Sequence, residues 1–376
     1  MPPFSGTLNT NEIFAGLFNQ ILSLQTFEPS IAGNNVKIVD EAKTDGGMFG
    51  DQKLFFSTDC LASSDWLNDA EAANLLNLYR PEDPETQAIV VNIFRNVKLT
   101  IDYYLTKRAW GSATAFYQFQ SVMLTWIRKT KRIYEKTTYN VFIGNNVTNV
   151  GKQKQECTLT GSTNRGLDIA LFMANLVSHL TDVSRMFNDY GHIQEFSKDE
   201  IKIIWNSKYV NEILKKELPV IFHNDKLFNN FDYVLPESYF GEAPDDTASS
   251  GNLAKLVTAG ELSETSGTYK VLVDDCKVRA KKEIAVTVGD KVIDVFAGQP
   301  MPKNYEFTED DFDKIYVVNE NVICKVVTKL PPLLSGFEVQ TSFFNPASLT
   351  ETEFLIWAHN TLEHLKEFPF ITVYEI

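Results

Sequence analysis

The stretch TAFYQFQSVMLTWIRKTKRIYEK, residues 114–136, predicts one long amphipathic helix. At about 100° per residue, its apolar side chains fall within an arc roughly 140° wide, the pattern of a helix that is buried along one face. We therefore expect a helix over residues 112–140 that packs through this arc. The arc contains Phe116, Phe119, Val122, Met123, Trp126, Ile127, Ile133 and Tyr134, and the opposite side carries Arg128, Lys129, Arg132 and Lys136.

This basic cluster stands in a chain of 376 residues whose formal net charge is -14. An acidic surface does not favour broad contact with nucleic acid or an anionic membrane, because such contact rests on many Lys and Arg side chains. Two interpretations of the cluster remain. It is the solvated face of the helix, or it contacts an anion, either phosphate or an acidic neighbour.

Length and composition indicate a globular protein with a sizeable core. The chain is 44% hydrophobic and could form two ordinary domains, or one body with large excursions. Its cysteines, Cys60, Cys157, Cys276 and Cys324, lie far apart without metal-ligand or redox spacing, so we expect neither a zinc site nor a disulfide framework. A reducing compartment and no membrane-spanning segment are expected, because no run of about 18 apolar residues is present.

The N-terminal third predicts an arm followed by a hairpin. Residues 1–35 contain an amphipathic segment, NEIFAGLFNQILSLQTF, whose apolar residues include Phe14 and Phe18. Residues 36–59 hold two strand-like runs that flank Gly46, Gly47 and Gly50, as a long charged hairpin would. Such a hairpin is marginal alone, so we expect it to lie on another surface.

The remaining elements follow from turn and periodicity signals. A short helix is expected over residues 65–80, a strand over 94–110, a helix over 166–190 that stops at Gly191, and a strand over 200–205 followed by another helix. Short β-branched strands follow residue 267, including a hairpin that turns at Gly289 and Asp290. A capping-box pattern at 348–351 predicts a helix through residue 368 before a final strand over 371–376.

Catalytic and metal-binding patterns are absent from the sequence. It contains no glycine-rich phosphate loop, no nucleophile elbow and no HExxH motif. His359 and His364 are five residues apart and would point to different faces of a helix. The acidic groups near residues 245, 274 and 309–313 lack the spacing of a calcium loop. We therefore expect no enzyme activity, no cofactor and no metal.

The order of these parts resembles the major capsid proteins of tailed bacteriophages, which share the Johnson or Hong Kong 97 fold. The resemblance covers nearly the whole chain in layout. It is closest in IDYYLTKRAWG, TKRIYEKTTYNVFIGNNVTNVG, DEIKIIWNSKYVNEIL and FFNPASLTETEFLIW. These stretches look most like the capsid proteins of crAss-like phages.

The resemblance implies an α+β fold with defined parts. Residues 1–35 would be the N-terminal arm, 36–80 the extended loop (E-loop) that reaches over a neighbouring subunit, and 81–206 the peripheral domain with its spine helix at 112–140. Residues 207–376 would form the axial domain, with a β-rich insertion at about 245–330 and a C-terminal return to the peripheral domain. The implied assembly contacts are Phe14, Phe18, Lys37, Asp45, Gly46, Gly47 and Lys53.

The resemblance also implies a structural role. The chain would self-assemble as pentamers and hexamers into an icosahedral shell around double-stranded DNA, bound without sequence specificity, after assembly in the cytoplasm of a bacterial host. Implied partners are further copies of the chain and separate scaffold, portal and decoration proteins, without a membrane. Arg128, Lys129, Arg132 and Lys136 would face the lumen or a neighbour. The alternatives are an encapsulin-like compartment shell of the same fold and an unrecognised α/β enzyme.

Overall fold

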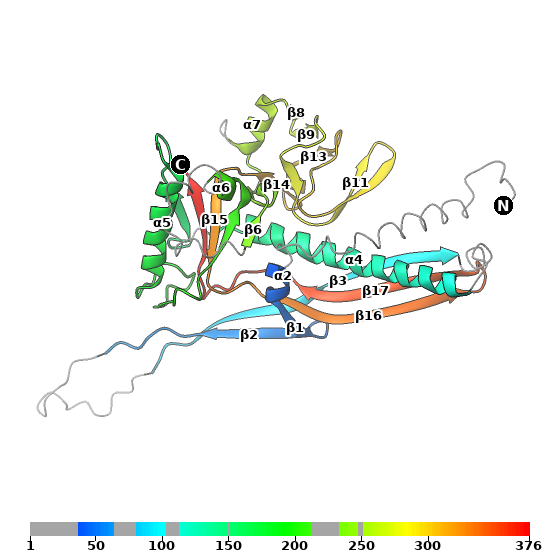
Figure 1. The fold of residues 1–376 in the computed structure, drawn as a ribbon, viewed down its shortest axis with the longest axis horizontal. Coiled ribbons are helices and arrows are strands. Elements are labelled where there is room, and N and C mark those ends of the chain that lie inside the picture. Colours follow the sequence, from blue (N-terminus) through cyan, green and yellow to red (C-terminus); the bar gives the residue numbers. More distant parts are fainter. Residues whose placement is uncertain (1–36, 64–79, 103–112, 149, 213–232, 247–250) are drawn as a thin grey trace, which may run out of the picture.

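The protein is elongated, with a long helix lying along a sheet of long strands and two smaller parts at one end (Figure 1). The computed structural model describes residues 37–63, 80–102, 113–148, 150–212, 233–246 and 251–376, and for residues 113–123 it describes the backbone alone. The predicted contacts Phe14 and Phe18 lie outside these residues. So does the helix expected at 65–80, except for its last residue, Arg80. No helix of the described chain is long and apolar enough to cross a membrane.

The long helix and the long sheet form the first layer pair. Helix α4 (Ala113–Asn145) confirms the helix expected at 112–140. The sheet has the order β1-β16-β17-β3-β2, with β3 (Glu85–Asp102), β16 (Leu333–Asn345) and β17 (Thr350–Asn360) as its long antiparallel strands. Alternate β3 residues are shielded and exposed, because successive side chains of a strand point to opposite faces.

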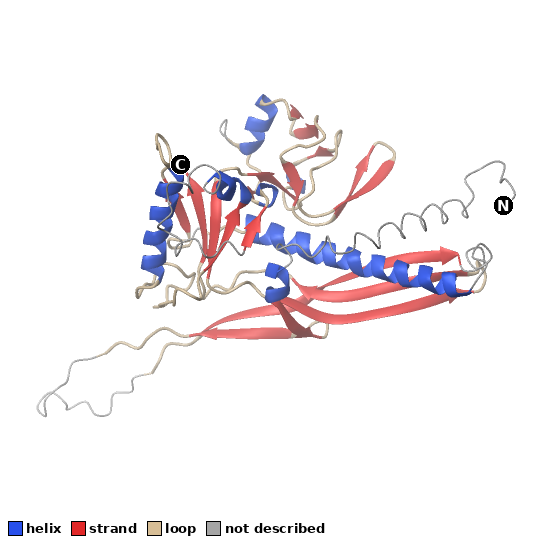
Figure 2. Cartoon of the chain, in the orientation of Figure 1, coloured by secondary structure: helices blue, strands red, loops and turns tan. Residues whose placement is uncertain are grey.

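Helix α4 covers one face of this sheet (Figure 2). Ile127 and Tyr134 pack with Leu355 and Trp357 of β17, and each fully buried apolar side chain of this kind contributes about 1.5–3 kcal/mol. Trp126, which the helical arc predicted to be buried, is 46% exposed, so that part of the prediction is wrong. The helix therefore meets the sheet through a narrower stripe than the sequence pattern indicated.

A buried polar chain fixes the helix on the sheet. The Nε of Arg95 donates to the Tyr134 hydroxyl at 3.2 Å, and that hydroxyl lies 2.9 Å from Nε2 of His359. The other ring nitrogen, Nδ1, lies 2.8 Å from the Asn360 carbonyl oxygen, which can only accept, so Nδ1 carries the proton and Nε2 accepts from Tyr134. Burial lowers the pKa of His359, which favours this neutral form.

A second five-stranded sheet lies at one end of α4. Its order is β4 (Lys154–Cys157), β18 (Phe370–Glu375), β15 (Val322–Val327), β5 (Lys202–Asn206) and β6 (Tyr233–Leu235). Helix α5 (Arg165–Leu180) covers one face through Ile169, Met173 and Leu176. The other face packs on α2 (Lys37–Ala42) and on Tyr139 and Ile143 of α4. The strands expected at 200–205 and 371–376 are confirmed.

The third part is rich in short strands. It contains β7 (Gly241–Glu242), α7 (Asn252–Thr258), β8 (Leu262–Thr265), β9 (Thr268–Val271), β10 (Val278–Ala280), β11 (Ile284–Val288), β12 (Lys291–Val295), β13 (Glu306–Phe307) and β14 (Ile315–Val318), with one shared apolar core. The expected hairpin is confirmed: β11 pairs with β12, and Gly289 turns between them at φ +63. Two short 3-10 helices complete the element order, η5 (Glu237–Tyr239) before β7 and η6 (Glu309–Asp311) before β14.

The hairpin expected over residues 36–59 is wrong. Its first run forms α2, whose Ile38 and Val39 are buried, followed by the short strand β1 (Lys43–Gly47). Strand β1 pairs in parallel with β16, whereas β2 (Gln52–Ser57) pairs with β3, so the two runs end at opposite edges of the long sheet. Burial of α2 between α4 and the second sheet overrides the strand propensity of this sequence.

The C-terminal helix expected from residue 348 is also wrong, because those residues form the turn into β17 and the strand itself. Strand β17 has partners on both sides, β16 and β3, and this pairing outweighs the local capping pattern. Helix α5 is shorter than expected and ends at Leu180 rather than near Gly191. Helix α6 (Ser207–Glu212) begins where the sequence predicted a helix after β5.

The second sheet joins segments from both sides of the domain boundary expected at residue 206. Strand β5 precedes that boundary and pairs with β6 and β15, which follow it. The β-rich part runs from β7 to β14, close to the insertion expected at about 245–330. Strands β16 and β17 return to the long sheet before β18 closes the second one.

A fully buried lysine lies between α4 and the second sheet. Lys325 of β15 donates to the backbone carbonyl of Asn146, directly after the last residue of α4, and its Nζ lies 4.5 Å from the centre of the Phe370 ring. Burial lowers the pKa of Lys325 well below its usual range. The contact ties the end of the helix to the central strands of the sheet.

Lys325→Met should stabilise the unassembled subunit at neutral pH by about 1–2 kcal/mol, because desolvation of the amine outweighs one hydrogen bond. The unfolded chain binds more protons than the folded one between the lowered folded pKa and about pH 10.4, so the wild-type penalty shrinks as pH rises. Urea unfolding from pH 6 to 10 should show the gain of the variant shrinking in parallel. A constant loss of stability at every pH would contradict this and show that a charged Lys325 stabilises the helix end.

Candidate assembly surfaces

Apart from Lys37, the described residues of the predicted contact set lie at the two edges of the long sheet. Lys37 begins α2, and Lys53 lies on β2, the opposite edge strand. Asp45, Gly46 and Gly47 lie on or end β1. A Cβ at Gly46 would meet the Leu334 Cβ at 3.0 Å, so this glycine serves packing inside the chain and is not a hairpin tip.

The projecting hairpin of the structure is made by β2 and β3. Their register runs from Gln52 opposite Val90 to Ser57 opposite Glu85, and both strands lead away from the body at this end (Figure 1). Leu54 and Phe56 are exposed on one face of the hairpin. The sequence predicted a hairpin over residues 36–59 in which β2 would be the second strand. In the structure β2 is the first strand of the hairpin, and β3 is the second.

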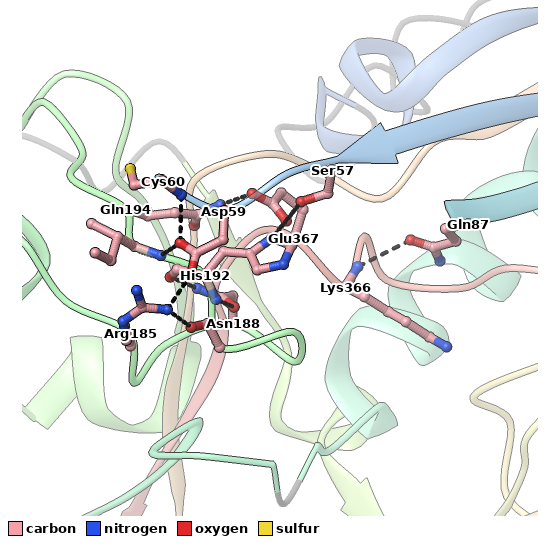
Figure 3. Close-up of polar contacts among 12 residues, drawn as sticks. Ser57, Asp59, Cys60, Gln87, Arg185, Asn188, His192, Gln194, Lys366 and Glu367 are labelled. Carbon is pink, nitrogen blue, oxygen red and sulfur yellow. Dashed lines mark hydrogen bonds and ion pairs between the residues drawn. The ribbon is translucent and has the colours of Figure 1, made fainter. Parts of the chain in front are cut away.

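A polar cluster anchors β2 to the body (Figure 3). The Ser57 hydroxyl lies 2.6 Å from Nδ1 of His192 and donates to Glu367. The same ring nitrogen lies 3.1 Å from Oε2 of Glu367, whose other oxygen accepts from Gln194. Because serine and carboxylate meet the same nitrogen of His192, this arrangement cannot relay a proton through the ring as a catalytic triad does.

Asp59 provides the second point of attachment. Its Oδ1 accepts from the backbone N–H of Ile193 at 3.0 Å and of Cys60 at 2.8 Å, and Oδ2 pairs with Arg185. The hydrogen bond from Ile193, with that from Arg185, lowers the pKa of Asp59 to about 2. The start of the projecting segment is therefore tied to the loop between α5 and β5 by a carboxylate that is ionised at neutral pH.

The partner strand β3 is attached through Gln87. Its side-chain nitrogen donates to the His364 carbonyl at 2.9 Å, and its oxygen accepts from the Lys366 backbone N–H at 3.1 Å. Residues 364–367 therefore hold both strands of the hairpin, since Glu367 also binds Ser57. These contacts are between segments far apart in sequence, and no local pattern indicated them.

Asp59→Asn should loosen the hairpin without unfolding the subunit. The folded-state pKa lies below the ordinary value of 3.8, so the contribution of Asp59 is present above about pH 4 and lost as pH falls toward 2. We expect hydrogen exchange at the Ile193 amide to accelerate several-fold in the variant at pH 7. Glu82→Gln, on the exposed part of the same hairpin, is the matched control, and equal exchange in both variants would refute the anchor.

No described helix or second sheet lies along the face of β3, β16 and β17 opposite α4 (Figure 2). At the start of this face Ala358 is buried, and Phe49 of the turn between β1 and β2 packs on Phe94. Across β3, β17 and β16, side chains of one row share this face, because paired residues of antiparallel strands point the same way. The exposed aromatic residues include Phe94, 53% exposed, and Phe343, 61% exposed. The rows are Phe94, Ala358 and Phe337; Asn96, Ile356 and Val339; Lys98, Phe354 and Thr341; Thr100, Thr352 and Phe343; and Asp102, Thr350 and Asn345.

This open sheet face, defined by those five rows, is poor in charge. Lys98 and Asp102 are its charged residues, in a chain that is 22% charged. Its aromatic rings associate with one another: the centre of the Phe94 ring lies 5.6 Å from that of Phe49 and 6.4 Å from that of Phe337. Aromatic enrichment with charge depletion distinguishes protein interfaces from ordinary surface.

The structure brings two of the predicted basic residues of α4 beside polar partners of the same chain. Nη2 of Arg128 donates to Gln340 at 3.0 Å, and Arg132 lies 3.7 Å from Asp40. Arg128, Lys129 and Arg132 are exposed, and Lys136 is half-buried. The cluster is therefore partly balanced within the subunit, and the prediction that it faces a lumen or neighbour stays a prediction.

Lys131, a further basic residue of α4, makes a closer ion pair than Arg132 does. Its Nζ lies 2.6 Å from Glu338 and 3.4 Å from Glu135, and its side chain is 12% exposed. Glu135 is buried and also pairs with Lys43 of β1 at 2.7 Å. Lys131 thus joins α4 to both β16 and, through Glu135, β1.

Lys131→Ala should lower the free energy of unfolding by about 1–3 kcal/mol, because it leaves the buried Glu135 with one cation in place of two. Lys129→Ala, two residues away on the exposed side, should change it by less than about 0.5 kcal/mol. Chemical denaturation of both unassembled variants measures the difference. Equal losses would mean that the Lys131 contacts contribute no more than a surface ion pair.

The described residues show no cluster of three or more metal-ligating side chains, and the described cysteines are free thiols. Burial raises the pKa of Cys157 and Cys276 to about 11, which makes these thiols unreactive at neutral pH. The residues that sequence reasoning missed are those of the anchor and of the open sheet face. Alternation along β3 from residue 94 to 100 was the one local signal for that face.

The fold is that of chains from phage capsid structures. No family model matches the sequence, and no curated protein matches it significantly. The capsid structure of Staphylococcus phage Andhra contains a chain that is 10% identical, with a TM-score of 0.57, over 89% of this chain and 83% of that one. A chain from the structure of the head fiber and inner core protein gp22 of native bacteriophage P68 is 11% identical, with a TM-score of 0.56 and the same coverage.

Proposed function

We propose that this chain is the major capsid protein of a tailed bacteriophage, with the Hong Kong 97 fold. In this role it assembles as pentamers and hexamers into an icosahedral shell around double-stranded DNA. The observation that carries the proposal is the open sheet face together with the projecting hairpin, in a fold shared with chains of phage capsids. A subunit with such surfaces completes its burial against neighbours.

The parts of the fold receive roles in this proposal. Helix α4 is the spine helix, and the N-terminal arm assigned to residues 1–35 from the sequence lies outside the described residues. The E-loop in this proposal is the β2–β3 hairpin, whose paired residues are 52–57 and 85–90. The sequence had assigned the E-loop to residues 36–80. The long sheet with α4 represents the peripheral domain, and the second sheet with the β-rich part represents the axial domain.

The proposed setting is the virion of a crAss-like phage, assembled in the cytoplasm of its bacterial host. Scaffold, portal and decoration proteins are the proposed partners, and the DNA is held without sequence specificity. The encapsulin-like compartment remains the alternative shell, and it differs in what it encloses. The enzyme alternative has no described nucleophile, metal cluster or proton relay that supports it.

Electron microscopy and sedimentation of the expressed protein, with and without a co-expressed scaffold, test this function. We expect large closed particles, or pentamers and hexamers that convert to them. Phe94→Asp with Phe343→Asp should abolish particles while leaving the subunit folded, because charge placed on an apolar contact costs several kcal/mol when buried. Circular dichroism of the unassembled variant checks that it folds.

Val292→Asp, at an apolar position on β12 that is 69% exposed, is the matched control and should assemble normally. Small discrete oligomers under every condition would refute the shell function. Particles that enclose protein cargo and no DNA during infection would favour the compartment over the capsid.

A further inference from the structure

Strand β16 has a partner on one side only over most of its length. Strand β1 pairs with it from Leu333 to Gly336, and β17 pairs with its other side as far as Asn345. From Phe337 to Asn345, no described strand lies on the β1 side of β16. The backbone N–H and C=O groups that point to this side can therefore pair with a further strand. We call this side of residues 337–345 the free edge.

The free edge exists because the chain leaves β16 after Gly47. Gly47 is the last residue of β1 that pairs with β16, and Gly50 already donates from its backbone N–H to the Val91 carbonyl of β3 at 2.8 Å. The turn between them crosses the open sheet face, where Phe49 packs on Phe94. Residues 340–344 of β16 are consequently exposed on both faces, whereas no residue of the central strand β17 is exposed.

Basic side chains of α4 flank the free edge on one face. Arg128 donates to a side-chain amide of β16 at 3.0 Å and has no carboxylate partner among the described residues. Arg132 lies 3.7 Å from Asp40, and both of these side chains are exposed. The carboxylate of β16 at this place, Glu338, already pairs with Lys131 at 2.6 Å. The positive charge beside the free edge is therefore not fully balanced within the described chain.

The other face of the free edge is apolar, because it belongs to the open sheet face. Phe337, Val339 and Phe343 lie there, in the rows given above. A strand added at an edge continues the alternation of the sheet, so its residues would lie in turn beside the arginines and beside these apolar side chains. The free edge thus fits an extended segment in which acidic and apolar residues alternate.

This chain does not itself supply such a segment. Its sequence contains no run of five residues in which acidic and apolar residues alternate. Its acidic runs, such as PEDPE at 81–85 and EDD at 309–311, place carboxylates next to one another instead. The charge pattern beside β16 therefore points to another protein as the source of the segment.

We propose that the free edge of β16 binds an extended segment of a different protein, in which acidic and apolar residues alternate. The segment adds a strand beside β16, its carboxylates pair with Arg128 and Arg132, and its apolar side chains widen the open sheet face. The inference does not rest on the shell function, because the free edge is a property of the single subunit. It gives a specific role to the basic cluster of α4, for which the sequence left two interpretations open.

Residue-resolved hydrogen exchange tests this contact on the unassembled full-length subunit. The probe is a peptide of about eight residues that alternates glutamate and valine, which is long enough to span the free edge. With the peptide bound, we expect every second amide between Phe337 and Asn345 to exchange at least about tenfold more slowly, because the amides between them already pair with β17. A peptide of the same composition, with its glutamates and valines in separate blocks, is the control and should protect none of them.

Charge reversal tests the part of the arginines. Arg128→Glu with Arg132→Glu should weaken binding of the glutamate peptide at least about tenfold, and a peptide that alternates lysine and valine should then bind the variant better than it binds wild type. Lys129→Glu, at an exposed residue with no ion pair or hydrogen bond to the described part of β16, is the matched control and should change the affinity less than about twofold. Circular dichroism checks that both variants fold.

Four outcomes would overturn the proposal. Two are the absence of alternate protection in wild type and equal binding of the glutamate peptide to wild type and the double variant. Protection of the same amides in the free subunit would show that this chain covers its own edge. Protection that grows with subunit concentration would show that two copies pair there. None of these outcomes depends on whether the protein forms shells.

Discussion

The packing of one helix on one face of a three-stranded core sheet is the constraint on which the rest of the structure depends. Helix α4 can bury a single face of β3, β16 and β17, and the chain from Arg95 through Tyr134 to His359 fixes which face and which register. Because each strand alternates its side chains, covering one face leaves the other as a complete second surface. Its aromatic, charge-poor rows are therefore a consequence of the fold and not of a loop that happens to be exposed.

Strand β3 belongs both to the long sheet and to the projecting hairpin, so the packing of the sheet also positions the hairpin. The strand is 18 residues long, so the same backbone forms the centre of the sheet and one arm of the projection. The hairpin direction is then set at its root, where residues 364–367 contact Ser57 and Gln87. Those residues also connect β17 to β18, so the two large sheets and the hairpin share one short junction.

Local sequence signals predicted the elements whose determinants are local. The apolar arc predicted α4, and the turn residues Gly289 and Asp290 predicted the hairpin of β11 and β12. The errors concern segments whose partners are distant: β1 finds its partner about 290 residues away in β16, and β17 is held between β16 and β3 against a helix-start pattern. The anchor and Lys325 have no local signature, because each joins residues from three segments that are far apart in sequence. For the candidate surfaces, the sequence predicted which residue types to expect, such as the charged Lys53. It did not predict where these residues lie relative to one another in the fold.

The distribution of charge over the surface limits which parts of this acidic chain can associate with another copy. Copies with a net charge of -14 repel one another, so association requires surfaces where that charge is absent or reversed. The open sheet face, with Lys98 and Asp102 as its charged residues, meets the first condition. Repulsion elsewhere then disfavours misaligned encounters, because a shift away from a charge-poor face brings the carboxylates of two copies together.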